Sequence, residues 1–126
     1  MAKFMTDVLK HKIIDALRGT SFSVDALELA LYTVAPTTAG GGTEVTGGSY
    51  SAQDFTLDTP ASGTADNVGQ IQFLDMPGVT VTAAAVRDKL THEPLWVNDG
   101  LSIVCAAGSN KAVNAGELDL SFPAVA

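Results

Sequence analysis

The stretch LELALY at residues 27–32 decides the fold, because three leucines in it alternate with residues of other kinds. A period of two is that of a β-strand, whose successive side chains point to opposite faces of a sheet. Pro36 follows and ends the strand, since proline has no backbone N–H to donate to a ladder. The sequence therefore predicts a strand with one clearly buried face.

The same alternation returns along the rest of the chain, separated by clusters of turn-forming residues. The strongest hairpin signal is Asn98-Asp99-Gly100, which stands between two apolar runs. We expect roughly six to eight short strands with a turn every 8–12 residues or so, the pattern of a β-sandwich or barrel. Beyond the first strand, they are predicted at residues 50–57, 71–73, 79–85, 95–97, 101–107 and 118–122.

The first residues follow a different period and predict an amphipathic helix over residues 4–18. Thr6 is the expected N-cap, and Arg18-Gly19 is a typical helix end. An isolated helix of this length is only marginally stable in water. Its apolar stripe is therefore expected to be buried against another part of the chain or against a partner. The stripe consists of Phe4, Val8, Leu9, Ile13, Ala16 and Leu17.

These patterns together predict an all-β protein, an antiparallel β-sandwich of Ig-like or jelly-roll-like type, preceded by one N-terminal helix. The chain has 126 residues, the size of one ordinary domain. We expect a helical segment at residues 1–20 and a single β-sandwich domain at residues 21–126.

Charge is distributed unevenly between these two parts. The net charge of −7 argues against nucleic-acid binding, which needs a surface rich in Lys and Arg. Residues 1–18 carry a net charge of +2, whereas the remainder carries −9. The basic helix is therefore expected to dock either on its own domain or on an acidic partner surface.

Residues 37–49 form a Gly-rich segment with no periodicity, which predicts a flexible loop. Its three consecutive glycines are not followed by the Gly-Lys-Ser/Thr of a phosphate-binding loop, and Glu44 would repel phosphate. Trp96, the single tryptophan, is either a core anchor in a strand or an interface hot spot.

Candidate catalytic or metal-binding groups are few. Cys105 is the single cysteine and stands in an apolar run, which indicates a buried thiol and excludes an intrachain disulfide. His11 and His92 are the only histidines and are predicted on a helix surface and in a solvated turn. No nucleophile elbow occurs, so we expect no catalytic site, no cofactor and no metal. We also expect no membrane span and no secretory signal.

Several segments together resemble a family of small tailed-bacteriophage virion proteins that are often labelled tail-fibre proteins. These segments are residues 17–20 (LRGT), 29–37 (LALYTVAPT), 41–50 (GGTEVTGGSY) and 111–117 (KAVNAGE). The chain departs from the family pattern at Ser51-Ala52, where Ala-Arg is usual, and at residues 81–87, where the family is aromatic and Gly-rich. Similar small β-sandwich proteins serve as capsid decoration, or cement, proteins.

The resemblance implies a structural virion protein assembled in the bacterial host cytoplasm. A capsid decoration protein is expected first, binding the major capsid protein as a homotrimer or other homo-oligomer. A tail, neck or fibre-base component is the alternative, and a host-surface carbohydrate-binding module is the second alternative. Neither nucleic acid nor membrane is expected as a partner. The residues predicted to bind the partner are Phe4, Val8, Leu9, Ile13, Thr43, Glu44, Val45 and Trp96.

Overall fold

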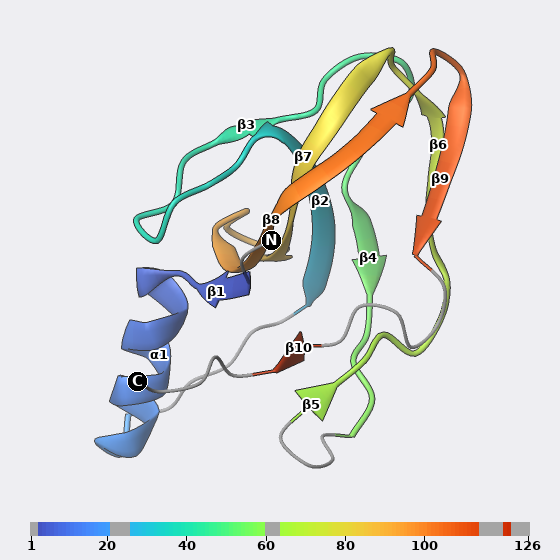
Figure 1. Ribbon diagram of the computed structural model, residues 1–126. Coiled ribbons are helices and arrows are strands. Elements are labelled where there is room, and N and C mark those ends of the chain that lie inside the picture. Colours follow the sequence, from blue (N-terminus) through green and yellow to red (C-terminus); the bar gives the residue numbers. More distant parts are fainter. Residues whose placement is uncertain (1–2, 21–25, 60–63, 114–119, 122–126) are drawn as a thin grey trace.

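A computed structural model describes residues 3–20, 26–59, 64–113 and 120–121 and shows a mostly β protein with one short helix (Figure 1). The elements in chain order are β1 (Lys3–Met5), α1 (Asp7–Leu17), β2 (Leu27–Val34), β3 (Thr43–Glu44), β4 (Gln53–Phe55), β5 (Thr64–Ala65), β6 (Ile71–Met76), β7 (Val79–Asp88), β8 (Pro94–Cys105), β9 (Ser109–Val113) and β10 (Leu120–Ser121).

The main sheet has the order β1-β8-β7-β2-β3, and β4 also pairs with β2, beside β3. All of its pairs are antiparallel, as are the two smaller sheets, β6–β9 and β5–β10. The β6–β9 pair lies opposite the main sheet (Figure 1). This arrangement confirms the predicted antiparallel β-sandwich with an N-terminal helix.

The core between the two layers is built from the leucine-bearing face of β2 and from the strands that pack against it. Leu29 and Leu31 of β2 face β6, which contributes Ile71 and Phe73. The cluster also includes Val81, Val86, Trp96 and Cys105, so the predicted burial of the single thiol is confirmed. Burying large apolar side chains in this way is the main favourable contribution to folding.

The other face of β2 is buried as well, which the alternation alone did not indicate. Ala30 and Tyr32 pack with Ala83 and Ala85 of β7 and with Val97 of β8 in a second cluster. Alanine is small, so a strand in which alanine alternates with leucine gives the same pattern as a strand with one buried and one exposed face. The sequence pattern therefore did not distinguish a buried alanine face from an exposed one. Phe4 of β1 packs against this second cluster.

The predicted hairpin at Asn98-Asp99-Gly100 is wrong. These residues lie inside β8, which runs without a break from Pro94 to Cys105. Gly100 has a φ of 75°, and the register between β7 and β8 shifts beside it, so the Asp-Gly pair makes a bulge rather than a turn. The chain reverses instead before Pro94, where His92 has a φ of 61°, and again at Gly108.

The N-terminal helix begins later than the pattern predicted. Phe4 and Met5 form strand β1, which pairs with β8, and α1 begins at Asp7. Thr6 occupies the N-cap position, but its hydroxyl makes no cap bond. It donates instead to the Pro94 carbonyl at 2.6 Å, and its own N–H donates to the Leu95 carbonyl at 2.9 Å. Among the described residues, no helix is both long and apolar enough to cross a membrane.

Candidate functional site

Among the described residues, a group of ionisable side chains gathers on the Ala-rich face of the main sheet. We call it the charged cluster: Glu28 of β2, Glu44 of β3, Arg87 of β7 and His92 of the β7–β8 turn. Arg87 is 6% exposed and Glu28 is 4% exposed. The Arg87 guanidinium contacts Glu28 Oε2 through Nε at 2.7 Å and Nη2 at 2.5 Å, and Glu44 Oε1 through Nη1 at 2.9 Å. His92 Nδ1 lies 2.8 Å from the same Glu28 oxygen.

Tyr50 connects the charged cluster to the backbone of β2. On that edge of β2, β4 pairs with residues 27–29 and β3 with residues 32–34. The Leu31 N–H lies between these two ladders and donates to the Tyr50 hydroxyl at 2.9 Å. The hydroxyl in turn donates to Glu44 Oε2 at 2.8 Å. One phenol therefore satisfies a backbone donor that neither strand reaches.

Burial and these contacts shift the pKa values of the cluster and its neighbours. Burial raises the pKa of Tyr50, and its hydrogen bond to Glu44 raises it further. Burial also raises the pKa of Tyr32, whose hydroxyl lies 3.4 Å from Arg87 Nη1. For Arg87, burial alone would lower the pKa, but the hydrogen bonds to Tyr32 and Glu44 outweigh it and raise the pKa. Both phenols and the guanidinium thus stay protonated near neutral pH.

This chemistry suits holding strands together better than acid–base catalysis. An arginine that stays charged cannot donate or accept a proton in a reaction. The two carboxylates are engaged by Arg87 and by the Tyr50 hydroxyl. Buried charges persist when they are paired and hydrogen-bonded, and here the pairs join β2, β3 and β7. Among the described residues, no three His, Cys, Asp or Glu side chains come together to hold a metal ion.

Sequence reasoning missed the charged cluster. The predicted strand at residues 27–32 had one buried face, that of the leucines, and Arg87 fell outside the predicted strands at residues 79–85 and 95–97. Arg87 in fact lies near the end of β7, directly opposite Glu28 in the ladder. The available signal was weak: Arg87 is one of only three Lys or Arg residues after residue 18, all in an otherwise acidic body.

Three of the predicted partner-binding residues are used inside the chain. Val45 and Trp96 are buried in the core cluster, which for Trp96 is the core-anchor alternative. Glu44 is engaged by Arg87 and Tyr50. Thr43 is exposed in β3, while Phe4 packs beside Val97.

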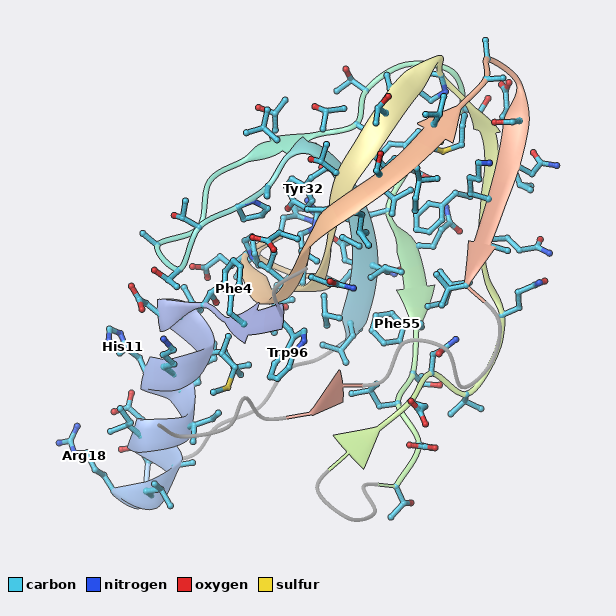
Figure 2. All side chains as sticks on the ribbon, in the orientation of Figure 1. Phe4, His11, Arg18, Tyr32, Phe55 and Trp96 are labelled. Atoms are coloured by element: carbon cyan, nitrogen blue, oxygen red, sulfur yellow. The ribbon has the colours of Figure 1, made fainter. Side chains whose placement is uncertain are left out.

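The remaining predicted residues lie on α1, which contains no buried residue. Val8, Leu9 and Ile13 are half-buried, and Leu9 packs against the core cluster. Towards the end of the helix the apolar side chains become exposed: Ile14 is 52% exposed and Leu17 is 84% exposed. Figure 2 shows His11 and Arg18 on α1 directed away from the sheet, in contrast to Trp96. We call Ile14, Leu17 and Arg18 the helix tip.

The start of α1 is held much more firmly than the helix tip. β1 pairs with β8, and the fully buried Thr6 bonds to the β8 backbone. The Asp7 N–H donates to the Thr38 carbonyl at 2.7 Å, so the Gly-rich segment contacts the helix start. That segment contains a tight turn from Thr37 to Gly40 before β3 begins. The helix is therefore anchored at its start and carries its exposed apolar side chains, Ile14 and Leu17, in its last turn.

Comparison with protein families matches residues 4–125 to the family described as podophage GP4 fiber I protein gp80. The match covers nearly the whole chain, including the helix, both layers of the sandwich and the segments between them. A comparison with curated proteins gives no match.

Proposed function

The chain belongs to the family described as podophage GP4 fiber I protein gp80, a family of structural proteins of tailed phages, and from this premise we propose that it is a structural component of the fibre part of the virion. Its task in this proposal is to bind another virion protein and stay bound. Binding only the assembled structure would stabilise that structure by mass action. The family description supports a fibre role more directly than a role on the capsid shell.

The observation that carries the proposal is the helix tip. Leu17 and Ile14 expose apolar surface that a lone small domain would gain by burying. Arg18 extends from the same turn, where its exposed guanidinium pairs with Asp15 at 3.2 Å, and Lys10 and His11 are exposed earlier on the helix. A partner surface with an apolar groove rimmed by carboxylates would fit this combination.

The interior of the chain supports a structural role in a different way. In the charged cluster, Arg87 bonds to both Glu28 and Glu44, and these contacts keep β2, β3 and β7 in register. The strands joined by these contacts are therefore already ordered before the chain binds a partner. Binding then requires ordering little beyond the partner contact itself, which favours stable attachment.

Decoration of the capsid shell is the second candidate, with the chain bound to the major capsid protein as a homotrimer or other homo-oligomer. The two-layered β-sandwich favours it, because similar small β-sandwich proteins serve as capsid decoration proteins. A tail or neck position would use the same helix contact. The exposed residues of the helix tip would fit a partner at the fibre, the tail, the neck or the shell equally well. We therefore rank the fibre first because of the family description.

Counting and locating copies in purified particles separates these candidates. Quantitative mass spectrometry of virions, with cryo-electron microscopy of particles labelled through this chain, gives both values. A few to a few tens of copies at the tail would support the fibre proposal. Hundreds of copies distributed over the shell would overturn it in favour of decoration, and absence from particles would overturn both.

A further inference from the structure

The layer of β6 and β9 and the layer of β7 and β8 are joined at one end, and both leave a strand edge open. β8 continues to Cys105, and a turn through Gly108 leads into β9. β1 covers the outer edge of β8 only at residues 96–98, and β9 pairs with β6 alone. Among the described residues, no strand therefore pairs with the outer edge of β8 at residues 101–105 or with that of β9. Figure 1 shows β8 and β9 diverging from the turn that joins them.

An apolar cavity of about 60 Å³ lies between β8 and β9. One buried water needs roughly 10–15 Å³, so the cavity has room for about four heavy atoms, the size of the branched end of a leucine side chain. Three consecutive residues of β9 line the cavity, although successive side chains of a strand point to opposite faces, so the edge of β9 borders it. The lining residues are Leu31, Phe73, Val81, Ile103, Lys111, Ala112 and Val113.

Lys111 gives this lining its one charge. No other charged residue occurs between Gly100 and Val113, whereas the chain after residue 18 carries a net charge of −9. Lys111 forms no ion pair with any residue that the structure describes. Its aliphatic stem can line the cavity while its ammonium group reaches water. The site therefore favours an apolar side chain that is flanked by carboxylates.

A segment with this pattern occurs near the end of the chain. In residues 117–122 (ELDLSF), apolar residues alternate with two acidic residues and a serine. Leu120 and Ser121 are the described part of it, and they pair with β5. A ladder of two residues is shorter than the roughly 3–10 residues usual for a strand. Because that attachment is so small, a chain loses little when this segment pairs elsewhere.

We propose that residues 117–122 of a second copy of this chain add as a strand to the open edge of β9, with a leucine side chain in the cavity. The added strand pairs with the backbone N–H and C=O groups of that edge, as in other cases where a strand extends a sheet. The acidic residues of the donor lie near Lys111. Each copy donates one segment and accepts another, so the contact is heterologous and either closes into a ring or extends as a filament.

This contact goes beyond attachment through the helix tip, and it uses different residues. It joins copies of the chain to one another and does not depend on where in the particle they lie. An assay with the purified chain therefore tests it independently of the copy counts that test the fibre proposal.

Analytical ultracentrifugation of the full-length chain over a range of concentrations measures the contact, and we expect concentration-dependent association. Ile103→Asp places a charge at the apolar cavity and should weaken association at least about tenfold. Val104→Asp is the matched control, because Val104 is the next residue of β8, is 73% exposed and does not line the cavity. It should stay within about twofold of the unchanged chain. Circular dichroism checks that both variants are folded.

A charge exchange identifies the donor segment and shows whether it comes from another copy. Lys111→Glu and the double variant Glu117→Lys/Asp119→Lys each bring like charges together, so each alone should associate about fivefold more weakly. An equimolar mixture of the two should recover the association of the unchanged chain, because each cavity then meets a segment of opposite charge.

Three results would overturn the proposal. The first is a chain that stays monomeric at every concentration. The second is an association that Ile103→Asp and Lys111→Glu leave unchanged. The third is a mixture that associates no better than its two components, which would mean that the segment does not pass between copies. The charge exchange tests the contact even where Ile103→Asp does not fold, because Lys111 is half-exposed.

Discussion

Replacing Arg87 by methionine tests how strongly the charged cluster holds the sandwich. Methionine keeps most of the side-chain length but removes the charge, so Glu28 loses two close contacts and keeps only His92, whose side chain is largely exposed. A buried carboxylate left without its partner typically costs about 3–5 kcal/mol. Because Glu44 is partly exposed and retains Tyr50, most of this loss comes from Glu28. We therefore expect Arg87→Met to lower the free energy of unfolding by about 3–4 kcal/mol.

The matched control is Lys89→Met, which removes the cation of an exposed ion pair with Asp54. Exposed pairs contribute about 0–1 kcal/mol, so its effect should be small. Urea unfolding followed by Trp96 fluorescence and by circular dichroism measures both variants, with the slope checked for constancy. Adding Glu28→Gln to Arg87→Met removes the stranded charge and should recover at least about 1 kcal/mol. An Arg87→Met loss no larger than that of Lys89→Met would refute the assignment.

Three further predictions concern Tyr50 and residues near it. Tyr50→Phe leaves the Leu31 N–H without its acceptor and should lower the free energy of unfolding by about 1–3 kcal/mol in urea titrations, more than Tyr32→Phe. Because burial raises the pKa of Tyr50 and Tyr32 in the folded chain, the protonated phenols favour folding. The contribution of these two phenols to stability should therefore be constant below about pH 10, the pKa of an unfolded tyrosine, and should fall as the pH rises further; a contribution that rises above that pH would contradict this reasoning. Gly48→Ala should destabilise by about 1–3 kcal/mol in thermal unfolding, because its Cβ would lie 2.4 Å from the Asp75 carbonyl oxygen at a φ of +55°, whereas Gly41→Ala meets no atom within 4 Å and should cost only about 1 kcal/mol.

The sequence predicted the class of fold because alternation along strands survives in LELALY, in β6 and in β7. It also located the helix, the Gly-rich segment and the buried thiol. These features are local: each depends on residues that are neighbours in sequence. The hairpin at residues 98–100 failed because Asp-Gly fits a bulge as well as a turn, and only the pairing of β8 with β7 distinguishes the two.

The charged cluster depends on pairs that are far apart in sequence. Arg87 meets Glu28 across 59 positions, and a lone arginine in an acidic body does not indicate which carboxylate it contacts. For Val45 and Trp96, the sequence could not distinguish a residue buried in the core from a residue buried in an interface, because apolar side chains are typical of both. The predicted apolar stripe of the helix included Leu17, but the sequence alone did not indicate that this end of the stripe is exposed.

The claim that the chain attaches to the particle through the helix tip is tested most directly by incorporation of a Leu17→Asp variant. Leu17 is 84% exposed, so the substitution should leave the circular dichroism spectrum and thermal unfolding unchanged. Val104→Asp, at a position 73% exposed on β8, is the matched control. Particles produced with each variant in place of the natural chain are purified and their copies counted by mass spectrometry. We predict at least about a tenfold loss of incorporation for Leu17→Asp, the effect of about 1.4 kcal/mol in binding, and normal incorporation for Val104→Asp. Normal incorporation of folded Leu17→Asp would contradict the account.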